Sequence, residues 1–351
     1  MAPATTFAAQ LLRASADGFA GIAASRLFER MPELVSRYEP NAFEGWREHL
    51  RTQVENLAAA AADGVPDAFA RHLSWARTAF AARDVPAEHL QASLETLRGV
   101  LDSELPTAAA RQLAPYFEGA LEALAGEVRA QSEIDTGDGH GRLAADYVVD
   151  LLAGRAEQAR RRVVDAVAGG EPVPAVLTGV LVPALHQIGH RWHRGEIGVA
   201  EEHYATGVTR RVMARLLEDA PRAADNGKTV LVACVPGDAH DLAVQLVAGF
   251  FALDGWRAID LGADVPAADL ADVTERFAAD LVVLSVTLDV QRAACTKAVR
   301  AVREARPELP ILVGGPAFDL APDTWRATGA DAYCADPAES VREGRARVGL
   351  R

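Results

Sequence analysis

The stretch LHQIGHRWHRGEIGVAEEH, residues 185–203, places four histidines, three glutamates and one tryptophan within nineteen residues. These side chains offer metal-binding nitrogens, hydrogen-bond acceptors and a flat aromatic face. His186, His190 and His193 follow one another at i, i+4 and i+7, so they share one face of a helix. That spacing permits a zinc site, although no cysteine accompanies it, and it equally fits histidines that pack or face solvent.

A second chemical group lies in PGDAHDLA, residues 236–243, directly after the apolar run TVLVAC. Asp238 precedes His240 by two residues, and a carboxylate there can accept the hydrogen of one imidazole nitrogen while the other binds a metal. The alternative is that Asp238 caps the next helix and His240 is merely exposed in its first turn. Because a D-x-H triplet is common, the spacing leaves both interpretations open.

Short apolar runs alternate with amphipathic segments from residue 226 onward. The runs are TVLVAC, WRAIDL, DLVVLS, PILVGG and AYC, each followed by a helix-like segment. This order predicts a flavodoxin-like, five-stranded parallel sheet with crossover helices. The ligand of such a sheet lies beyond the carboxyl ends of the strands, between the first and third. We therefore expect the site in PGDAHDLA and in the loops SVTLD (285–289) and VGGPAF (313–318).

The chain before the sheet is predicted to be helical throughout. Apolar residues at three- and four-residue spacing indicate a bundle of four or five helices up to about Glu133. The segment IDTGDGHG, residues 134–141, has the composition of a linker, and a second set of four helices follows between Leu143 and Leu217. The predicted fold is α plus α/β, with a helical bundle at 1–138, a four-helix cap at 139–225 and the sheet domain at 226–351.

Composition excludes several classes of function. The net charge is −13, and residues 1–138 contain 12 Arg and no Lys against 20 acidic residues, so we expect no nucleic-acid partner. We find no signal peptide and no apolar run of the roughly 20 residues that a membrane span needs, which predicts a cytoplasmic protein without membrane contact. Three scattered cysteines, Cys234, Cys295 and Cys334, predict neither a disulfide framework nor a thiolate metal cluster.

The sheet domain and the helices before it resemble the cobalamin-binding fold over residues 140 to 345. That family carries D-x-H-x-x-G after the first strand, a serine motif after the third and a glycine pair after the fourth. The matching residues are Asp238, His240, Ser285, Thr287, Gly314 and Gly315, while Ala243 stands in place of the motif glycine. The resemblance implies that His240 is the lower axial cobalt ligand, with the dimethylbenzimidazole tail displaced into the sheet between Ser285 and the glycine pair.

The segment VLVPALHQIGHRWHRGEIGVAEEH resembles the cap of light-sensing adenosylcobalamin proteins. It does not resemble the G-x-x-F-x-x-G cap of corrinoid carriers. The resemblance implies that Trp192 packs against the adenosyl group, Glu202 accepts hydrogen bonds from it and His203 lies beside the corrin. In that family visible light breaks the cobalt–carbon bond, and the residue that matches His193 then binds cobalt and moves the cap helix.

The implied function is a light sensor and not an enzyme. Two other functions remain open: a corrinoid carrier that serves a methyltransferase, and a light-insensitive, cobalamin-responsive interaction module. Light is expected to change a homo-oligomeric assembly, and the signalling partner is unknown.

An acidic bundle before such a cap resembles the photocobilins, which pair cobalamin with a bilin. The resemblance implies biliverdin as a second chromophore, held non-covalently in this region because no cysteine precedes residue 234. A bilin needs an apolar slot and arginines for its propionates. The candidate residues are Arg71, His72 and Trp75, with Trp46, His49 and His89 as further side chains of suitable type. Each of them equally fits interior packing.

Overall fold

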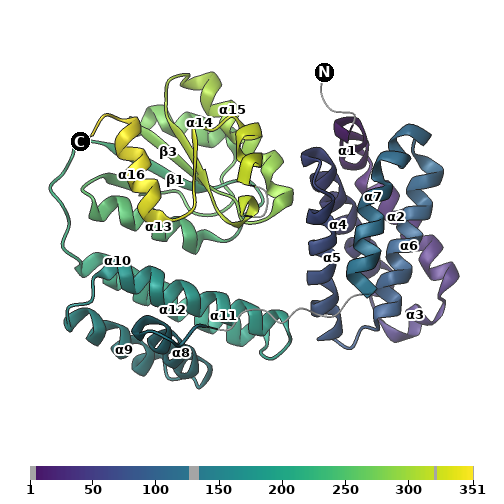
Figure 1. The fold of residues 1–351 in the computed structure, drawn as a ribbon, viewed down its shortest axis with the longest axis horizontal. Coiled ribbons are helices and arrows are strands. Elements are labelled where there is room, and N and C mark those ends of the chain that lie inside the picture. Colours follow the sequence, from purple (N-terminus) through teal and green to yellow (C-terminus); the bar gives the residue numbers. More distant parts are fainter. Residues whose placement is uncertain (1–4, 126–133, 320–321, 351) are drawn as a thin grey trace. The chain divides into compact units, whose positions relative to one another are not determined.

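A computed structural model describes residues 5–125, 134–319 and 322–350. The chain divides into two compact units, Met1–Arg129 and Ala130–Arg351, which the colours of Figure 1 distinguish. This division lies just before the predicted linker, residues 134–141. Part of that linker is in fact helical, because the Asp138 side chain accepts a hydrogen bond from the Gly141 N–H (2.7 Å) and begins a helix at Gly139.

The described part of the first unit is helical, as predicted. Its seven helices exceed the expected four or five because two are short. They are α1 (Thr5–Ala14), α2 (Ala16–Arg30), α3 (Glu33–Arg37), α4 (Ala42–Asp63), α5 (Pro66–Ala81), α6 (Ala87–Glu104) and α7 (Thr107–Ala125).

The helix boundaries of the first unit follow local signals of unequal strength. Gly64 adopts a left-handed conformation (φ 69°) that ends α4, and Pro66 begins α5. The break at Ser15 between α1 and α2 has neither glycine nor proline. Alanines of α2 and α4 are buried in the shared core, where their small side chains let the helices approach closely.

The second unit begins with the four-helix cap. Its helices are α8 (Gly139–Leu152), α9 (Ala156–Ala168), one continuous helix over 173–193, and α12 (Val199–Asp219). The continuous helix consists of α10 (Val173–Val176), a π turn η1 (Leu177–Leu181) and α11 (Val182–His193). The Val182 N–H donates to the Leu177 carbonyl, five residues back. Pro183 explains the wide turn, because it has no N–H to donate and its ring crowds the preceding turn.

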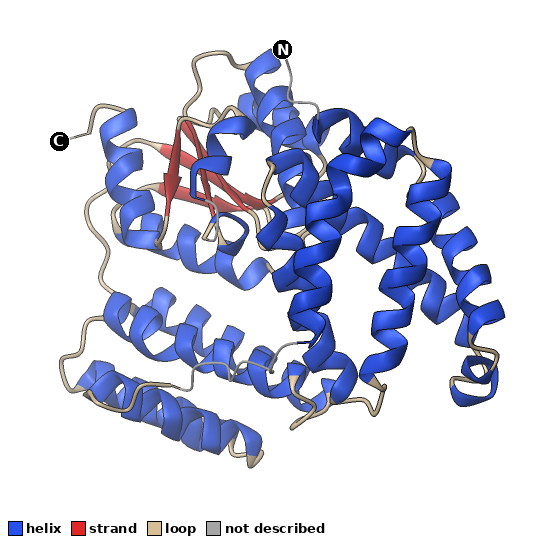
Figure 2. Cartoon of the chain, turned by 45° about the vertical axis from the view of Figure 1, so that its right-hand side comes forward, coloured by secondary structure: helices blue, strands red, loops and turns tan. Residues whose placement is uncertain are grey.

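The sheet has the predicted five parallel strands in the order β2-β1-β3-β4-β5. Figure 2 shows the strands in red with helices packed beside them. The strands are β1 (Thr229–Cys234), β2 (Arg257–Asp260), β3 (Leu281–Ser285), β4 (Ile311–Gly314) and β5 (Ala332–Cys334), and the helices are α13 (Asp241–Leu253), α14 (Ala267–Arg276), α15 (Arg292–Ala305) and α16 (Pro337–Arg347). This is the flavodoxin-like order. The helix expected after β4 is replaced by two 3₁₀ segments, Pro316–Phe318 and Pro322–Thr328.

The central strands are buried on both faces. Side chains of β1, β3 and β4 alternate between two cores, one under α14 and α15 and the other under α13 and α16. Cys234, Cys295 and Cys334 all lie buried in these cores as free thiols. In the register of the sheet Cys234 lies beside Ser285 and Ser285 beside Gly314, so the loops after β1, β3 and β4 begin at one edge.

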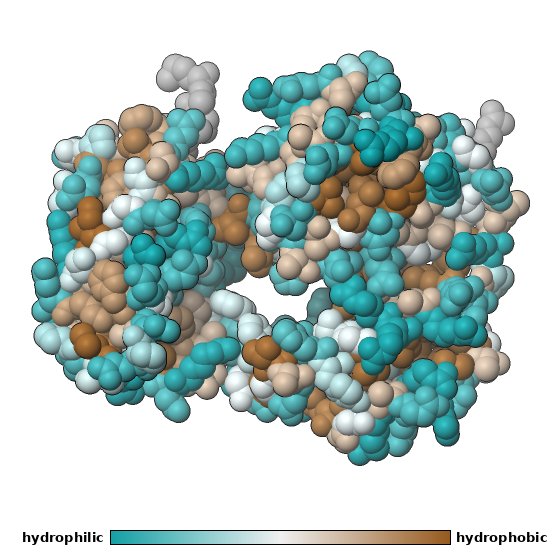
Figure 3. All heavy atoms as spheres, turned by 180° about the vertical axis from the view of Figure 1, so that it is seen from behind, coloured by the Kyte–Doolittle hydropathy of each residue, from teal (hydrophilic) through white to brown (hydrophobic). Residues whose placement is uncertain are grey.

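One described helix, Val173–His193, is long and apolar enough to cross a membrane by length and composition. Polar residues such as His186 and Gln187 interrupt this helix, so it is not a continuous apolar run of that length. Its apolar face includes Val176, Val180 and Ile188, which are buried in the cap core against the other helices. On the face drawn in Figure 3, apolar residues form separate patches between polar ones.

Candidate functional site

Asp238 and His240 meet at the carboxyl edge of the sheet. Oδ1 of Asp238 accepts hydrogen bonds from Nδ1 of His240 (2.8 Å) and from its backbone N–H (3.1 Å), while Oδ2 accepts from the backbone N–H of Thr287 (2.9 Å). Asp238 is fully buried and the His240 side chain is 59% exposed. The carboxylate therefore joins the loops after β1 and β3 and turns the imidazole so that Nε2 remains available.

The charges of this pair follow from the contacts. Burial acts to raise the pKa of Asp238, but the hydrogen bonds from His240 and Thr287 outweigh it and hold that pKa below its usual value. The bond to Asp238 raises the pKa of His240, burial opposes the rise, and the charges of Asp238, Glu202 and Asp241 add to it. An ionised Asp238 directs the Nδ1 hydrogen of His240 toward itself, the orientation found in metal-binding histidines.

The structure excludes the capping role of Asp238. Helix α13 begins at Asp241 with His240 as its N-cap residue, and no side chain caps it. Asp238 therefore does not cap the helix, although His240 is exposed as that alternative expected. Ala243, which stands in place of the motif glycine, is exposed on α13.

The predicted glycine pair is required by the sheet itself. Gly315 has φ 106°, and a Cβ there would lie 2.4 Å from the carbonyl oxygen of Val286. A Cβ on Gly314 would lie 2.8 Å from the carbonyl oxygen of Cys334. Ser285, 8% exposed, ends β3 beside Gly314. Thus Ser285 and both glycines lie together where the resemblance places the nucleotide tail.

Sequence reasoning missed Gln291, which braces the same loops. Its side-chain amide donates to the carbonyl of Gly237 (2.8 Å) and accepts from the backbone N–H of Leu288 (2.8 Å). Gln291 is 6% exposed. No motif marks it, and only the buried polar side chain reveals its role.

The cap places its predicted residues on α11 and α12. Trp192 is half-buried, His193 is 3% exposed and the His203 side chain is 74% exposed. Glu202 accepts a hydrogen bond from Oγ1 of Thr206 (2.7 Å), and its Oε2 lies 3.6 Å from Nε2 of His203. Arg210 of α12 pairs with Asp241, the residue after His240, at 2.7 Å, so the helix that carries Glu202 and His203 contacts the loop of His240.

The zinc alternative has no support in the described ranges. Within residues 5–125, 134–319 and 322–350, no three His, Cys, Asp or Glu side chains gather to hold a metal ion. His186 is exposed whereas His193 is buried, so the three histidines at i, i+4 and i+7 do not face a common space.

The candidate bilin residues lie in the first unit in two connected groups. The Trp46 ring packs edge-on against the His49 ring, with 5.5 Å between their centroids, and the centroids of the His49 and Phe80 rings lie 4.7 Å apart. His72 stacks on Trp75 at 6.2 Å. The charge of His72 also acts on His49.

Further contacts extend these groups. Nδ1 of His89 is hydrogen-bonded to the hydroxyl of Tyr38 (2.8 Å), and the His89 ring contacts Trp46. Nε2 of His49, Nε2 of His72 and Nε of Arg71 are buried with no hydrogen-bond partner among the described residues.

A cavity of about 200 Å³ opens beside the first group. Its lining is mostly apolar and aromatic, and comprises Tyr38, Asn41, Ala42, Gly45, Trp46, His49, Phe80 and Val85. Arg71, His72 and Trp75 do not line it. The cavity is also smaller than the roughly 300 Å³ or more of typical organic-ligand sites.

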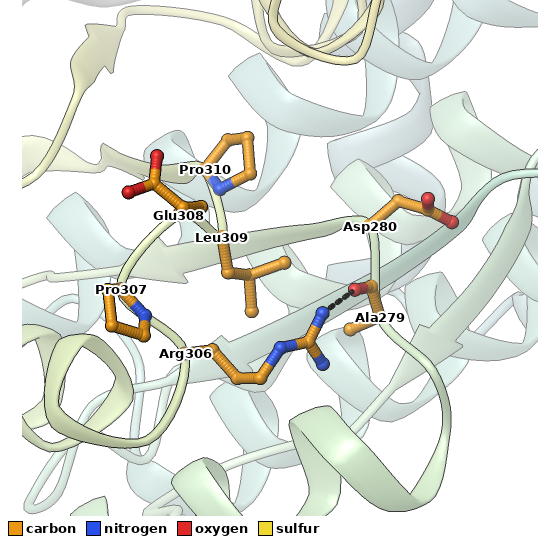
Figure 4. Close-up of a pocket in the computed structure, with 7 residues that line it drawn as sticks. All are labelled: Ala279, Asp280, Arg306, Pro307, Glu308, Leu309 and Pro310. Carbon is orange, nitrogen blue, oxygen red and sulfur yellow. Dashed lines mark hydrogen bonds between the residues drawn. The ribbon is translucent and has the colours of Figure 1, made fainter.

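A larger hollow, about 360 Å³, lies at the opposite edge of the sheet (Figure 4). Arg306 crosses it and donates to the carbonyl of Ala279 (3.4 Å). Asp280 points away toward Lys228, which it pairs with at 2.9 Å. Ligands of parallel sheets bind at the carboxyl edge, so this hollow is not the candidate site.

Two family matches cover the second unit. Residues 228–345 match the family described as B12 binding domain, and residues 143–217 match a second family with the same description. The first match contains Asp238, His240 and the glycine pair. The second contains the cap residues Trp192, His193, Glu202 and His203.

Relatives of known name are similar to part of the chain. The chain is 27% identical to the HTH-type transcriptional repressor CarH of Myxococcus xanthus, over 64% of this chain and 74% of that protein. It is 33% identical to the HTH-type transcriptional repressor CarA of the same organism, over 44% of this chain and about half (51%) of that protein. Trimethylamine corrinoid protein 1 of Methanosarcina acetivorans is 23% identical, over 57% of this chain and 91% of that protein.

The two family matches cover the cap and the sheet domain in the order that the structure shows. This chain is therefore a cobalamin-binding protein.

Proposed function

We propose that the protein is a light sensor that binds adenosylcobalamin and reports light through a change of its cap and its assembly. The observation that carries this proposal is the placement of the cap signature and the Asp238–His240 pair in one unit, where Arg210 of α12 pairs with Asp241, the residue after His240. The resemblance of residues 180–203 to light-sensing caps supports the adenosyl form and the response to light.

The lower side of the site fits a corrinoid. His240 has an exposed imidazole whose Nδ1 is held by a buried carboxylate, and its other nitrogen is a suitable cobalt ligand. We assign His240 as the lower axial ligand, Asp238 as the residue that fixes its tautomer, and Ser285, Thr287, Gly314 and Gly315 as the walls around the nucleotide tail.

The upper side fits an adenosyl group. When bound, adenosylcobalamin supplies a cobalt–carbon bond that visible light breaks. We assign Trp192 to contact with the purine, Glu202 to the ribose hydroxyls and His203 to the corrin edge. His193 is the proposed cobalt ligand of the illuminated state. Because its ring is 3% exposed, that role requires the end of α11 to move, which links light to the shape of the cap.

We also propose biliverdin as a second, non-covalent chromophore of the first unit. The aromatic and histidine cluster around Trp46 and His49 supports it, together with the unpartnered nitrogens of His72 and Arg71. The cavity of about 200 Å³ admits only part of a tetrapyrrole, so α4 and α5 must separate for the whole molecule to bind.

The proposed output is regulatory and not catalytic, through a light-dependent homo-oligomer and an unidentified protein partner. Two relatives are named HTH-type transcriptional repressors. The excess of acidic residues in the first 138 residues argues against DNA as the partner of this region. The second candidate function is a corrinoid carrier, which the similarity to trimethylamine corrinoid protein 1 favours.

Illumination of the purified full chain loaded with adenosylcobalamin separates the two. The light sensor should lose the adenosylcobalamin spectrum under green light and change its sedimentation. A carrier should show no light-dependent change of assembly, and it should accept a methyl group on bound cobalamin from a methyltransferase. A spectrum that bleaches with no change in sedimentation would reduce the proposal to cobalamin binding.

A further inference from the structure

Helix α12 contacts the sheet domain at two points along its length. Toward its C-terminus, Leu217 packs so closely over α13 that a Cβ on Gly249 would lie 2.4 Å from Leu217 Cδ1. Leu246 and Phe250 of α13 belong to the same apolar core as the cap. This apolar contact fixes one end of α12 but leaves the angle of its other end open.

The second contact is an ion pair. Arg210 of α12 donates two hydrogen bonds to the carboxylate of Asp241, at 2.9 and 2.7 Å. Such a bidentate pair constrains orientation as well as distance. Asp241 is the first residue of α13 and follows His240 directly, so the pair ties α12 to the loop that carries the proposed cobalt ligand.

A second carboxylate lies near this pair. Burial raises the pKa of Asp260, at the end of β2; the charge of Asp241 adds to the rise and that of Arg210 opposes it. Without Arg210 the two carboxylates would repel each other with no compensating charge. The carboxylates of Asp241 and Asp260 therefore attract the positively charged Arg210 of the cap to this part of the sheet domain.

Arg210 also shares a helix face with the proposed recognition residue. Glu202, Thr206 and Arg210 follow one another at i, i+4 and i+8, which places them in one row along α12. Thr206 donates a hydrogen bond to Glu202 at 2.7 Å. Because α12 is one continuous helix, the angle that the Arg210 contact gives to the helix also determines where Glu202 lies.

We propose that the Arg210–Asp241 ion pair is a positioning device that holds Glu202 over His240 and so determines the preference for the upper ligand of cobalamin. The recognition part rests on the function proposed above for Glu202. Arg210 and Asp241 are 41% and 33% exposed, and ion pairs of this exposure add little to global stability. The pair therefore acts on orientation more than on folding.

The first measurement concerns the protein without cofactor. Spin labels at Val199→Cys on α12 and Lys297→Cys on α15, both exposed in the sheet-containing unit, report the angle of α12 through their distance distribution. Arg210→Ala should broaden or shift that distribution. The matched control is Arg215→Ala, which removes an exposed α12 arginine that pairs with Asp219 at 2.6 Å and should leave the distribution unchanged.

The second measurement is the ratio of affinities for adenosylcobalamin and methylcobalamin in the full chain. Arg210→Ala should lower this ratio by about tenfold, the size of one lost hydrogen bond to a charged group. Glu202→Ala should lower it similarly, and the double variant should fall no further than either single variant. Arg210→Lys, which keeps the charge but not the paired geometry, should give an intermediate ratio.

The outcomes separate the two proposals. An unchanged distance distribution in Arg210→Ala overturns the positioning role, whatever the cofactor preference. A changed distribution with an unchanged ratio overturns the link to ligand recognition. If the wild-type chain binds both cobalamins equally, the proposed adenosyl recognition fails, while the distances still decide whether Arg210 sets the angle of α12.

Discussion

Nδ1 of His240 lies 2.8 Å from Oδ1 of Asp238, and the second oxygen of that carboxylate accepts the backbone N–H of Thr287 at 2.9 Å. One buried side chain thus fixes an exposed imidazole to the loop after the neighbouring strand. Removal of the Asp238 carboxylate therefore changes both the orientation of His240 and the contact between the two loops.

The first prediction concerns the lower ligand. His240→Ala should weaken cobalamin binding or leave the tail base coordinated to cobalt, because no imidazole replaces it. Electron paramagnetic resonance of the cob(II)alamin form, in protein labelled with nitrogen-15 histidine, distinguishes the two, because the histidine ligand gives a doublet splitting and the tail base a triplet. His186→Ala, at an exposed position of α11, is the control, and an unaltered spectrum in His240→Ala contradicts the assignment.

The second prediction concerns Trp192. Trp192→Ala should lower the affinity for adenosylcobalamin more than for methylcobalamin, because a methyl ligand has no purine to contact. Titrations followed by absorption give both constants. A tryptophan that serves only packing would instead lower the melting temperature equally with either ligand.

The third prediction concerns the bilin. Biliverdin added to the full chain should give a protein-bound far-red band, and His49→Ala should reduce it by removing a buried contact of the cluster. Phe7→Ala, at a 55% exposed position of the same unit, should leave the band intact. If the wild-type chain gives no band, the cluster around Trp46 is interior packing.

The fourth prediction concerns pH. Burial lowers the pKa of His49 from 6.5 to about 3, with His72 adding to the shift, and burial lowers the pKa of His72 to about 4. As pH falls, both histidines bind protons near pH 6.5 in the unfolded chain but only near pH 3 to 4 in the folded chain. The first unit should therefore lose stability as pH falls from about 6.5 toward 4. Urea unfolding at several pH values should show this slope, and His49→Gln should flatten it.

The fifth prediction concerns Gly315. Gly315→Ala should destabilise the second unit by about 1–3 kcal/mol or more, because the residue has φ 106° and its Cβ would meet the Val286 carbonyl. Gly207→Ala on α12 should be neutral or stabilising by up to about 1 kcal/mol. The added Cβ would lie 3.7 Å from the Arg211 side chain, an ordinary van der Waals distance. Thermal unfolding without cofactor checks both, and equal effects would contradict the argument.

The sheet could be predicted closely because buried parallel strands are continuous apolar runs with clear ends. The predicted run TVLVAC coincides with β1, Thr229–Cys234. The number of helices in the first unit was underestimated because α3 has only five residues and the break at Ser15, after the short α1, has no proline or glycine. The 3₁₀ segments after β4 likewise gave no periodic signal.

The candidate site was only partly predictable. Asp238 and His240 are two residues apart, so their pairing follows from local geometry. Arg210 and Asp241 are separated by 31 positions, and Gln291 joins loops 54 positions apart. The first contact depends on how the cap docks on the sheet and the second on how β1 and β3 pair, and no local pattern contains either.

The buried cysteines have a practical consequence for experiments on this chain. Burial raises the pKa of the thiols of Cys234, Cys295 and Cys334 to about 12, and nearby acidic groups add to the rise for Cys234 and Cys334. The thiolate is the form that attacks maleimides, so near neutral pH the native protein should be almost inert to them. A cysteine introduced on the surface then becomes the reactive handle for a fluorophore or spin label, with no need to replace the natural ones.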